Sequence, residues 1–421
     1  MPRHRFLLAL PLLAGCAAQP VENAALPPEA GLARYTGEVT IDPESGELDG
    51  TWTVRFAATN GMAAGASFLL NGRLELTSLT GDGIASWERA AWSDGSDWDQ
   101  VDVTWAEAPE PGEVRELQFD YHGTPFDSAG AHDRINSIGP TWVELGLDSG
   151  WPPVFADLDH ALTGELTLRL PGEWTVAASG DVTRLDDGYR IVNTVPLVDF
   201  AFAAGRKLRV DGTDRAAVYH EGAPAATIDK VVDAATTCRT WLDERYGELP
   251  DLTFVLAPRD DSGYARKNYI VLTRVDDYPM PDLSRFVCHE LAHYWSSAPS
   301  ADAPDYWMTE AFAELVSARH VRDVYGDSAY DAIVAQWRGQ ADGLPPVWTD
   351  TSSARPPFGV SYRKAPLVLT EFGASIGEET FAEVLGRYMT EETATTPQLL
   401  GQVEEVGGPA ARARLEAMLG R

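Results

Sequence analysis

The segment "VCHELAHYW", residues 287–295, contains two histidines four positions apart, with a glutamate directly after the first. On a helix, residues at this spacing lie on one face, so the imidazoles of His289 and His293 can reach one ion, with Glu290 beside them. This pattern is typical of the zinc-binding helix of metallopeptidases. Two buried histidines with structural hydrogen bonds would give the same pattern, so a metal centre requires a third ligand.

A third ligand is available in the segment "DYWMTEAFAEL", where Glu310 follows His293 after sixteen intervening residues. Two imidazoles and one carboxylate leave the fourth position of a zinc ion open for water. Glu314 lies one helical turn later on the same face and is the competing ligand, although a supporting or solvated role suits it better. The sequence therefore predicts one Zn²⁺ held by His289, His293 and Glu310.

The predicted chemistry is hydrolysis of a peptide or a related amide. Zinc lowers the pKa of a bound water to about 7, and Glu290 would accept its proton and pass it to the leaving amine. Tyr362, in "FGVSYRKAPLVLTEF", heads a helical pattern downstream of the ligands. A phenol at this place could stabilise the oxyanion, but the residue pattern alone leaves packing as the alternative.

The rest of the chain predicts two domains that position these residues. Short alternating segments such as "GTWTVRF", "ELQFDYHG" and "ELTLRL", separated by turns, predict a β domain over residues 35–212. The segment "PAATIDKVVDAATTCRTWLDERYG" predicts a helix that stops at Gly247. Two strands, "LTFVLAP" and "NYIVLTRV", and mostly helical patterns follow. We expect an α+β catalytic domain over residues 213–421.

The N-terminus has the features of a bacterial lipoprotein signal. Arg3 and Arg5 precede an apolar run that ends in Leu-Ala-Gly-Cys at Cys16. This predicts a signal peptide over residues 1–16, lipidation of Cys16, a flexible tether over residues 17–34, and a place in the cell envelope, on the periplasmic face of an outer membrane or on the cell surface. The alternative is a plain secretory signal with an accidental cysteine.

Net charge and cysteine content limit the remaining possibilities. A net charge of −31 disfavours binding to nucleic acid or to an anionic membrane surface. Cys238 and Cys288 remain in the mature chain, either as a disulfide or as two buried thiols.

The motifs together resemble those of the gluzincin zinc aminopeptidases, peptidase family M1, the family of aminopeptidase N. The helix from His289 to Trp295 is similar to the family's ligand helix, and "WMTEAFA" around Glu310 resembles its third-ligand segment. "YRKA", beginning at Tyr362, is similar to the stretch with the family's catalytic tyrosine. The segments "IDPESGELDGTWTVRF", "PLVDFAFAAG" and "LDERYGELP" resemble other parts of the family fold. The resemblance implies a saddle-shaped β domain followed by a thermolysin-like catalytic domain.

Three departures from the family pattern bear on function. The segment between His293 and Glu310 is shorter, and the chain ends at Arg421, about where the family's catalytic domain ends, so we expect a short form without the C-terminal helical domain and with a more open site. The family's Gly-x-Met-Glu-Asn loop, which holds the substrate amine, is replaced by "YARKN", residues 264–268. A lysine at 267 would repel a free α-amine by about 4 kcal/mol at 4 Å.

Several residues are therefore candidates for substrate binding. Asp260, Asp261 or Glu144 could replace the missing glutamate. Alternatively, Arg266 and Lys267, next to Asn268, could meet a substrate carboxylate, or the cleft could take internal or blocked peptide bonds. The two residues could also be a solvated basic pair on an edge strand. We expect an aminopeptidase-like zinc peptidase with a changed amine-binding loop. A non-catalytic zinc- or peptide-binding lipoprotein is the alternative, and the family's epoxide hydrolase activity is a further one that no residue here favours.

Overall fold

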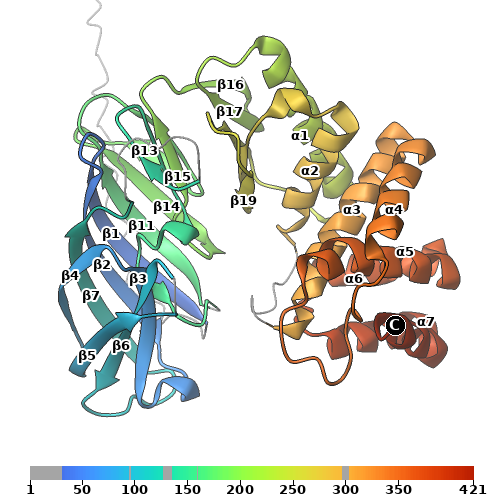
Figure 1. The fold of residues 1–421 in the computed structure, drawn as a ribbon, viewed down its shortest axis with the longest axis horizontal. Helices are drawn as coiled ribbons and strands as arrows, with labels where there is room; N and C mark the ends of the chain where they lie inside the picture. The colour runs from blue at the N-terminus through green and yellow to red at the C-terminus, as the bar shows by residue number, and fades with distance from the viewer. Residues whose placement is uncertain (1–30, 94–95, 127–134, 159, 296–302) are drawn as a thin grey trace, which may run out of the picture.

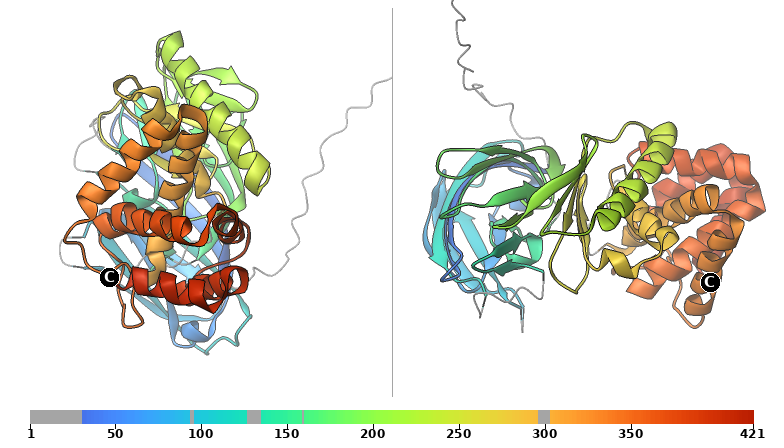
Figure 2. Two further views of the ribbon diagram at one scale, coloured as in Figure 1. Left: turned by 90° about the vertical axis from the view of Figure 1, so that its right-hand side faces the viewer. Right: turned by 90° about the horizontal axis from the view of Figure 1, so that it is seen from above.

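The protein consists of a β domain and a mainly helical domain, with a smaller sheet between them (Figure 1). The computed structural model describes residues 31–93, 96–126, 135–158, 160–295 and 303–421. Cys16, the predicted signal peptide and most of the predicted tether lie outside the described residues. The right-hand view of Figure 2 shows the same order of parts from above.

A seven-stranded sheet forms the largest layer of the β domain. Its strands alternate buried and exposed side chains, which explains the period-two pattern in the sequence. Strands β1 and β11 pair in parallel, and the other neighbours pair antiparallel. In spatial order the strands are β13 (Asp181–Arg184), β14 (Tyr189–Leu197), β11 (Ala161–Arg169), β1 (Leu32–Asp42), β2 (Glu47–Ala57), β7 (Val114–Gly123) and β4 (Leu74–Gly81).

Two four-stranded sheets complete the β domain and enclose an aromatic core. Trp52, Phe68 and Phe119 are fully buried there, and Phe68 packs edge-on against Phe119. One sheet has the order β10 (Val154–Phe155), β3 (Gly65–Asn71), β6 (Trp98–Trp105) and β5 (Ile84–Ala91). The other has the order β12 (Thr175–Ala178), β15 (Phe202–Gly205), β9 (Trp142–Leu145) and β8 (Ser137–Ile138).

A five-stranded sheet opens the second domain. Its order is β16 (Arg209–Thr213), β17 (Ala216–His220), β18 (Leu252–Leu256), β20 (Tyr269–Leu272) and β19 (Tyr264–Arg266), so β19 is an edge strand. The apolar residues of β18 and β20 pack against buried residues of β9 and β15, which joins the two domains. Helix α1 (Ala225–Tyr246) ends before Gly247, whose φ of 117° is accessible to glycine, as the sequence predicted.

The remaining chain is helical and carries the site. The helices are α2 (Met280–Ala292), α3 (Trp307–Tyr325), α4 (Asp327–Ala341), α5 (Ala365–Ile376), α6 (Glu378–Thr390) and α7 (Thr396–Leu419). A disulfide between Cys238 and Cys288 joins α1 to α2, with both residues fully buried. By chain entropy, closing this loop contributes about 4 kcal/mol. The open question of these two cysteines is thus answered in favour of the disulfide.

Two boundaries bear on the predicted domain limits. Strand β1 begins at Leu32, so residues 32–34, which we assigned to the tether, pair with β11 instead, and Ala33 is fully buried. The predicted boundary at residue 213 lies at the end of β16 and stays a prediction. Among the described residues, no helix combines the length and the apolar composition that crossing a membrane requires.

Candidate metal centre and active site

Helices α2 and α3 bring the three predicted metal ligands together. His289 lies in the last turn of α2, and His293 follows the helix end with φ −63° and ψ −11°, which keeps its side chain on the same face. Glu310 lies in the first turn of α3. His289 and Glu310 are buried, and the His293 side chain is 23% exposed. The site is therefore shielded on the protein side and accessible at His293.

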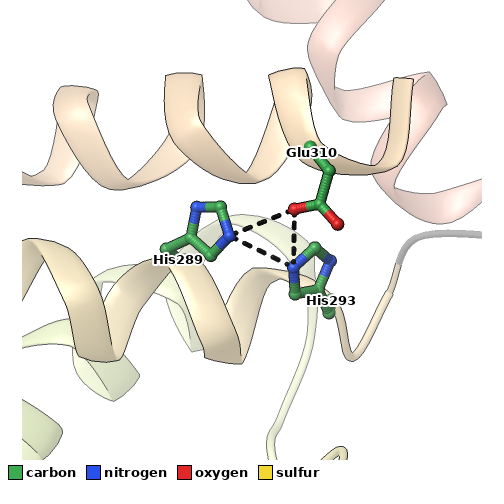
Figure 3. Close-up of side chains that lie close together, drawn as sticks. All are labelled: His289, His293 and Glu310. Carbon is green, nitrogen blue, oxygen red and sulfur yellow. Dashed lines mark hydrogen bonds and ion pairs between the residues drawn. The ribbon is translucent and has the colours of Figure 1, made fainter. Parts of the chain in front are cut away.

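The three ligand atoms form a nearly equilateral triangle, which Figure 3 shows. Nε2 of His289 lies 3.3 Å from Oε2 of Glu310, Nε2 of His293 lies 3.5 Å from the same oxygen, and the two nitrogens are 3.3 Å apart. Three ligands bound tetrahedrally to zinc at 2.0–2.1 Å would be about 3.3 Å apart. In the part of the chain that the structure describes, this is the single cluster of His, Cys, Asp and Glu with such ligand spacing. The residues therefore fit zinc.

The electrostatics of the triangle also suit a cation. Burial alone would lower the pKa of His289, but the hydrogen bond with Glu310 and the charges of Glu290 and Glu314 raise it to about 9. Burial likewise opposes ionisation of Glu310, yet its hydrogen bonds with both histidines hold the pKa of this carboxyl well below its usual range. Negative charge thus dominates the site, and a divalent cation would replace the proton that the His289 imidazole otherwise holds.

The carboxylates around the triangle have separate tasks. Tyr306 donates a hydrogen bond to Oε1 of Glu310 at 3.0 Å, which leaves Oε2 directed at the histidines. Oε1 of Glu314 lies 3.8 Å from Nδ1 of His289, on the side of the ring away from the triangle. Glu314 is also paired with Arg285 and, at 3.4 Å, with Arg363. Its position supports the His289 ring, so the competing ligand assignment is not favoured.

Tyr362 lies beside the triangle, and Glu290 directly follows His289 on α2. The charge of Glu290 contributes to the raised pKa of His289 and of Tyr362. Tyr362 belongs to a π-helical turn, Val360–Lys364, and its ring stacks on His289 at a centroid distance of 5.8 Å. Burial, together with the charge of Glu310 and a hydrogen bond to it, raises the pKa of the Tyr362 hydroxyl. This phenol stays protonated and can donate a hydrogen bond.

Two of the predicted substrate-binding residues form ion pairs between the domains. Glu144 is fully buried and accepts two hydrogen bonds from Arg259, at 3.0 and 2.8 Å. Arg266 makes a bidentate pair with the fully buried Asp199, at 2.7 and 3.1 Å. The assignment of Glu144 and Arg266 to substrate binding stays a prediction, and a substrate would have to compete with these two pairs. Each charge is already neutralised by a partner from the other domain.

The other candidates of this loop also contact other parts of the protein, with the exception of Asp260. Lys267 donates to the carbonyls of His293 and Tyr294, at 3.2 and 3.1 Å, and caps the end of the ligand helix. It is not the solvated or substrate-facing cation that the sequence suggested. Asn268 donates to the Asp251 carbonyl, and Asp261 pairs with Arg259 and accepts from the Ile135 amide at 2.7 Å. Asp260 is exposed.

Sequence reasoning missed Tyr306, Arg285 and Lys267 as supports of the site. Tyr306 had a signal, because an aromatic residue one helical turn before Glu310 can reach its carboxylate. Arg285 had a weaker one, since it lies four residues before His289 on the same helix. The capping contact of Lys267 joins residues 26 and 27 positions apart and had none.

Comparison with known proteins gives likenesses of structure alone. No model of a protein family matches the chain, and no curated protein does. A mutant M1 zinc metallopeptidase from Deinococcus radiodurans, bound to a Tyr-Ser-Ala substrate, is similar with a TM-score of 0.70 at 19% identity, over 92% of this chain and 93% of that chain. Native leukotriene A4 hydrolase from Saccharomyces cerevisiae has a TM-score of 0.72 at 14% identity, over 92% of this chain and 66% of that chain. The expected fold, a β domain followed by a thermolysin-like helical domain, is confirmed.

Proposed function

We propose that this chain, which has the fold of the M1 zinc metallopeptidases, is a zinc peptidase with His289, His293 and Glu310 as ligands. The observation that carries the proposal is the triangle of two imidazole nitrogens and one carboxylate oxygen with edges of 3.3, 3.3 and 3.5 Å. A zinc ion there would acidify a water molecule and polarise the substrate carbonyl. The open fourth position is what separates such a site from a structural zinc site.

The protein's own residues would supply the proton transfers. Glu290 accepts a proton from the attacking water and later gives it to the leaving amine. Tyr362 keeps its proton because its pKa is raised by burial and by Glu310, so its hydroxyl donates a hydrogen bond to the developing oxyanion. Tyr306 and Glu314 hold Glu310 and His289 in place from the outside.

The mode of cleavage follows from what holds the substrate amine. The resemblance to aminopeptidases favours removal of N-terminal residues. The expected repulsion from Lys267 loses its support, because its ammonium is bound to two carbonyls at the end of α2. Of the three carboxylates considered for the amine, Glu144 and Asp261 are paired, and Asp260 is exposed and stays the candidate.

Cleavage of a mixed peptide library by zinc-loaded protein, analysed by mass spectrometry, tests the proposal. The control is Glu290→Gln, which should keep the metal and lose about a thousandfold in rate. Single residues lost from free N-termini would support the aminopeptidase-like mode, and Asp260→Asn should then weaken it. Internal cuts would support an endopeptidase. A protein that binds zinc and cleaves nothing would refute the peptidase and favour a binding lipoprotein.

We propose further that a lipid on Cys16 anchors the enzyme in the cell envelope. The support is the basic start, the apolar run and the Leu-Ala-Gly-Cys sequence. Labelling cells with a radioactive fatty acid should mark the wild-type protein, and Cys16→Ser should lose both the label and the membrane association. An unlabelled wild-type protein in the soluble fraction would refute the anchor.

A further inference from the structure

An arginine in the segment between α4 and the π-helical turn lies one aromatic ring away from Glu310. The guanidinium carbon of Arg355 lies 3.8 Å from the ring centroid of Tyr306. The hydroxyl of the same tyrosine donates to Oε1 of Glu310 at 3.0 Å. Arg355 is exposed, so its guanidinium is accessible from the solvent beside the candidate metal centre.

Three other basic side chains of this region, on α2 and the π-helical turn, already have partners. Arg285 and Arg363 both pair with Glu314. Lys364 donates to three backbone carbonyls, those of Leu344, Pro345 and Arg421. No carboxylate of the described residues forms an ion pair with Arg355. In a chain with a net charge of −31, a cation in this position is available to an anionic ligand.

An exposed phenylalanine completes the surface. The Phe358 side chain is 63% exposed, which is the largest exposed fraction among the large apolar side chains of the described residues. Its ring stacks on Tyr362 at a centroid distance of 4.3 Å and an angle of 19°. Tyr362 in turn stacks on His289. An apolar contact surface therefore continues from the candidate oxyanion donor to the solvent.

We propose that Arg355 and Phe358 form a subsite for the C-terminal residue of a short peptide substrate. Arg355 would bind the free α-carboxylate, because a planar guanidinium matches a carboxylate with two hydrogen bonds. Phe358 would contact the side chain of the same residue. The contacts through Tyr306 place the guanidinium within about 10 Å of Glu310, a span that about three extended residues cover. The substrate class is therefore short peptides with a free C-terminus, and this inference rests on the proposed peptidase function.

Peptide binding to the zinc-loaded Glu290→Gln protein tests the subsite without relying on turnover. The probes are Ala-Ala-Leu as the free acid and as its C-terminal amide, measured by calorimetry. We expect the free acid to bind about tenfold more tightly than the amide. Adding Arg355→Gln should bring this ratio close to one, and Arg355→Lys should keep part of it. Adding Arg338→Gln, which removes an exposed arginine of α4, is the matched control and should keep the full ratio.

The apolar half of the subsite has its own readout. Phe358→Ala should weaken binding of Ala-Ala-Leu several-fold and change the binding of Ala-Ala-Gly much less, because glycine has no side chain to contact. Equal losses for both peptides would overturn the role of Phe358.

The outcomes separate this inference from the proposed function. Equal binding of acid and amide by protein that retains Arg355 would overturn the subsite, as would a tenfold ratio that survives Arg355→Gln. If the wild-type protein then still cleaves the amide, the proposed peptidase function holds without the subsite. A tenfold ratio that depends on Arg355, in a protein that cleaves neither peptide, would support the subsite and refute the peptidase.

Discussion

The metal triangle and the domain interface contain similar residue types but differ in how their partners are placed along the chain. At the triangle, His289 and His293 are four residues apart, and one helix fixes their relation. At the interface, Glu144 meets Arg259 at a separation of 115 residues, and Asp199 meets Arg266 at 67. A local relation can be derived from helix geometry, whereas the distant one depends on how two domains pack.

The same difference explains why one buried carboxylate is suited to bind a metal whereas another forms a structural ion pair. One oxygen of Glu310 is directed at two imidazole nitrogens in a negatively charged environment, and this arrangement suits a bound metal cation. Glu144 is also buried, but both its oxygens are bound by Arg259. Burial of a carboxylate is therefore not enough to identify a binding site. The position of the compensating charge decides between a ligand and a structural ion pair.

The largest expected effect comes from breaking the interface pair. Arg259→Met leaves Glu144 buried without its counter-ion, and we expect the free energy of unfolding to fall by about 4 kcal/mol. Adding Glu144→Leu should recover most of that loss, because the orphaned charge causes it. Urea unfolding followed by circular dichroism measures both variants.

An exposed pair of the same geometry is the control for this prediction. Arg190 and Glu165 are also bidentate, but their side chains are 49% and 37% exposed. Arg190→Met should therefore cost less than about 1 kcal/mol. If Arg259→Met costs as little, Glu144 is not held by its partner and is available to a substrate.

The sequence predicted what depends on local periodicity and missed what depends on packing. Spacing predicts the end of α1 at Gly247 and the approach of His289 to His293. A motif predicts the place of Tyr362 beside them. The partners of Arg266 and Lys267 lie in other elements, and no pattern in "YARKN" indicates them. The charge of these two residues can be read from their type, whereas the groups that they contact depend on how distant elements pack.

A buried histidine outside the triangle, His320, extends the comparison to the pH dependence of stability. Burial lowers the pKa of His320 to about 4, with Arg245 adding to the effect and Asp323 opposing it, whereas carboxylates raise that of His289. Because the folded pKa of His320 lies below the unfolded value of about 6.5, its stabilising effect is complete above pH 6.5 and is lost as pH falls toward 4. At pH 4.5 the loss should be about 2.5 kcal/mol.

Unfolding free energies at pH 7 and pH 4.5 measure this effect. His320→Gln can keep the hydrogen bond to Ser284, which spans 2.9 Å in the wild type, and should reduce the pH dependence by that amount. His122→Gln, which removes a histidine that is 42% exposed, is the control variant. Equal pH dependence in wild type and His320→Gln would show that His320 is already charged or solvated in the folded protein.

The smallest expected effect concerns a carboxylate that lies between the two cases. Glu314 is paired with arginines, as Glu144 is, yet it also lies 3.8 Å from Nδ1 of a proposed zinc ligand. Glu314→Gln should lower zinc affinity by about 10- to 100-fold while the fold persists, because the carboxylate orients the imidazole and increases its basicity. Competition with a chelator of known affinity measures the change. Glu378→Gln is the matched control, since Glu378 is paired with Arg319 and Arg322 away from the site and should not affect zinc. If Glu314→Gln binds zinc as tightly as this control, Glu314 belongs with the structural ion pairs. Of the two proposed supports of the metal ligands, Tyr306 and Glu314, Tyr306 would then remain.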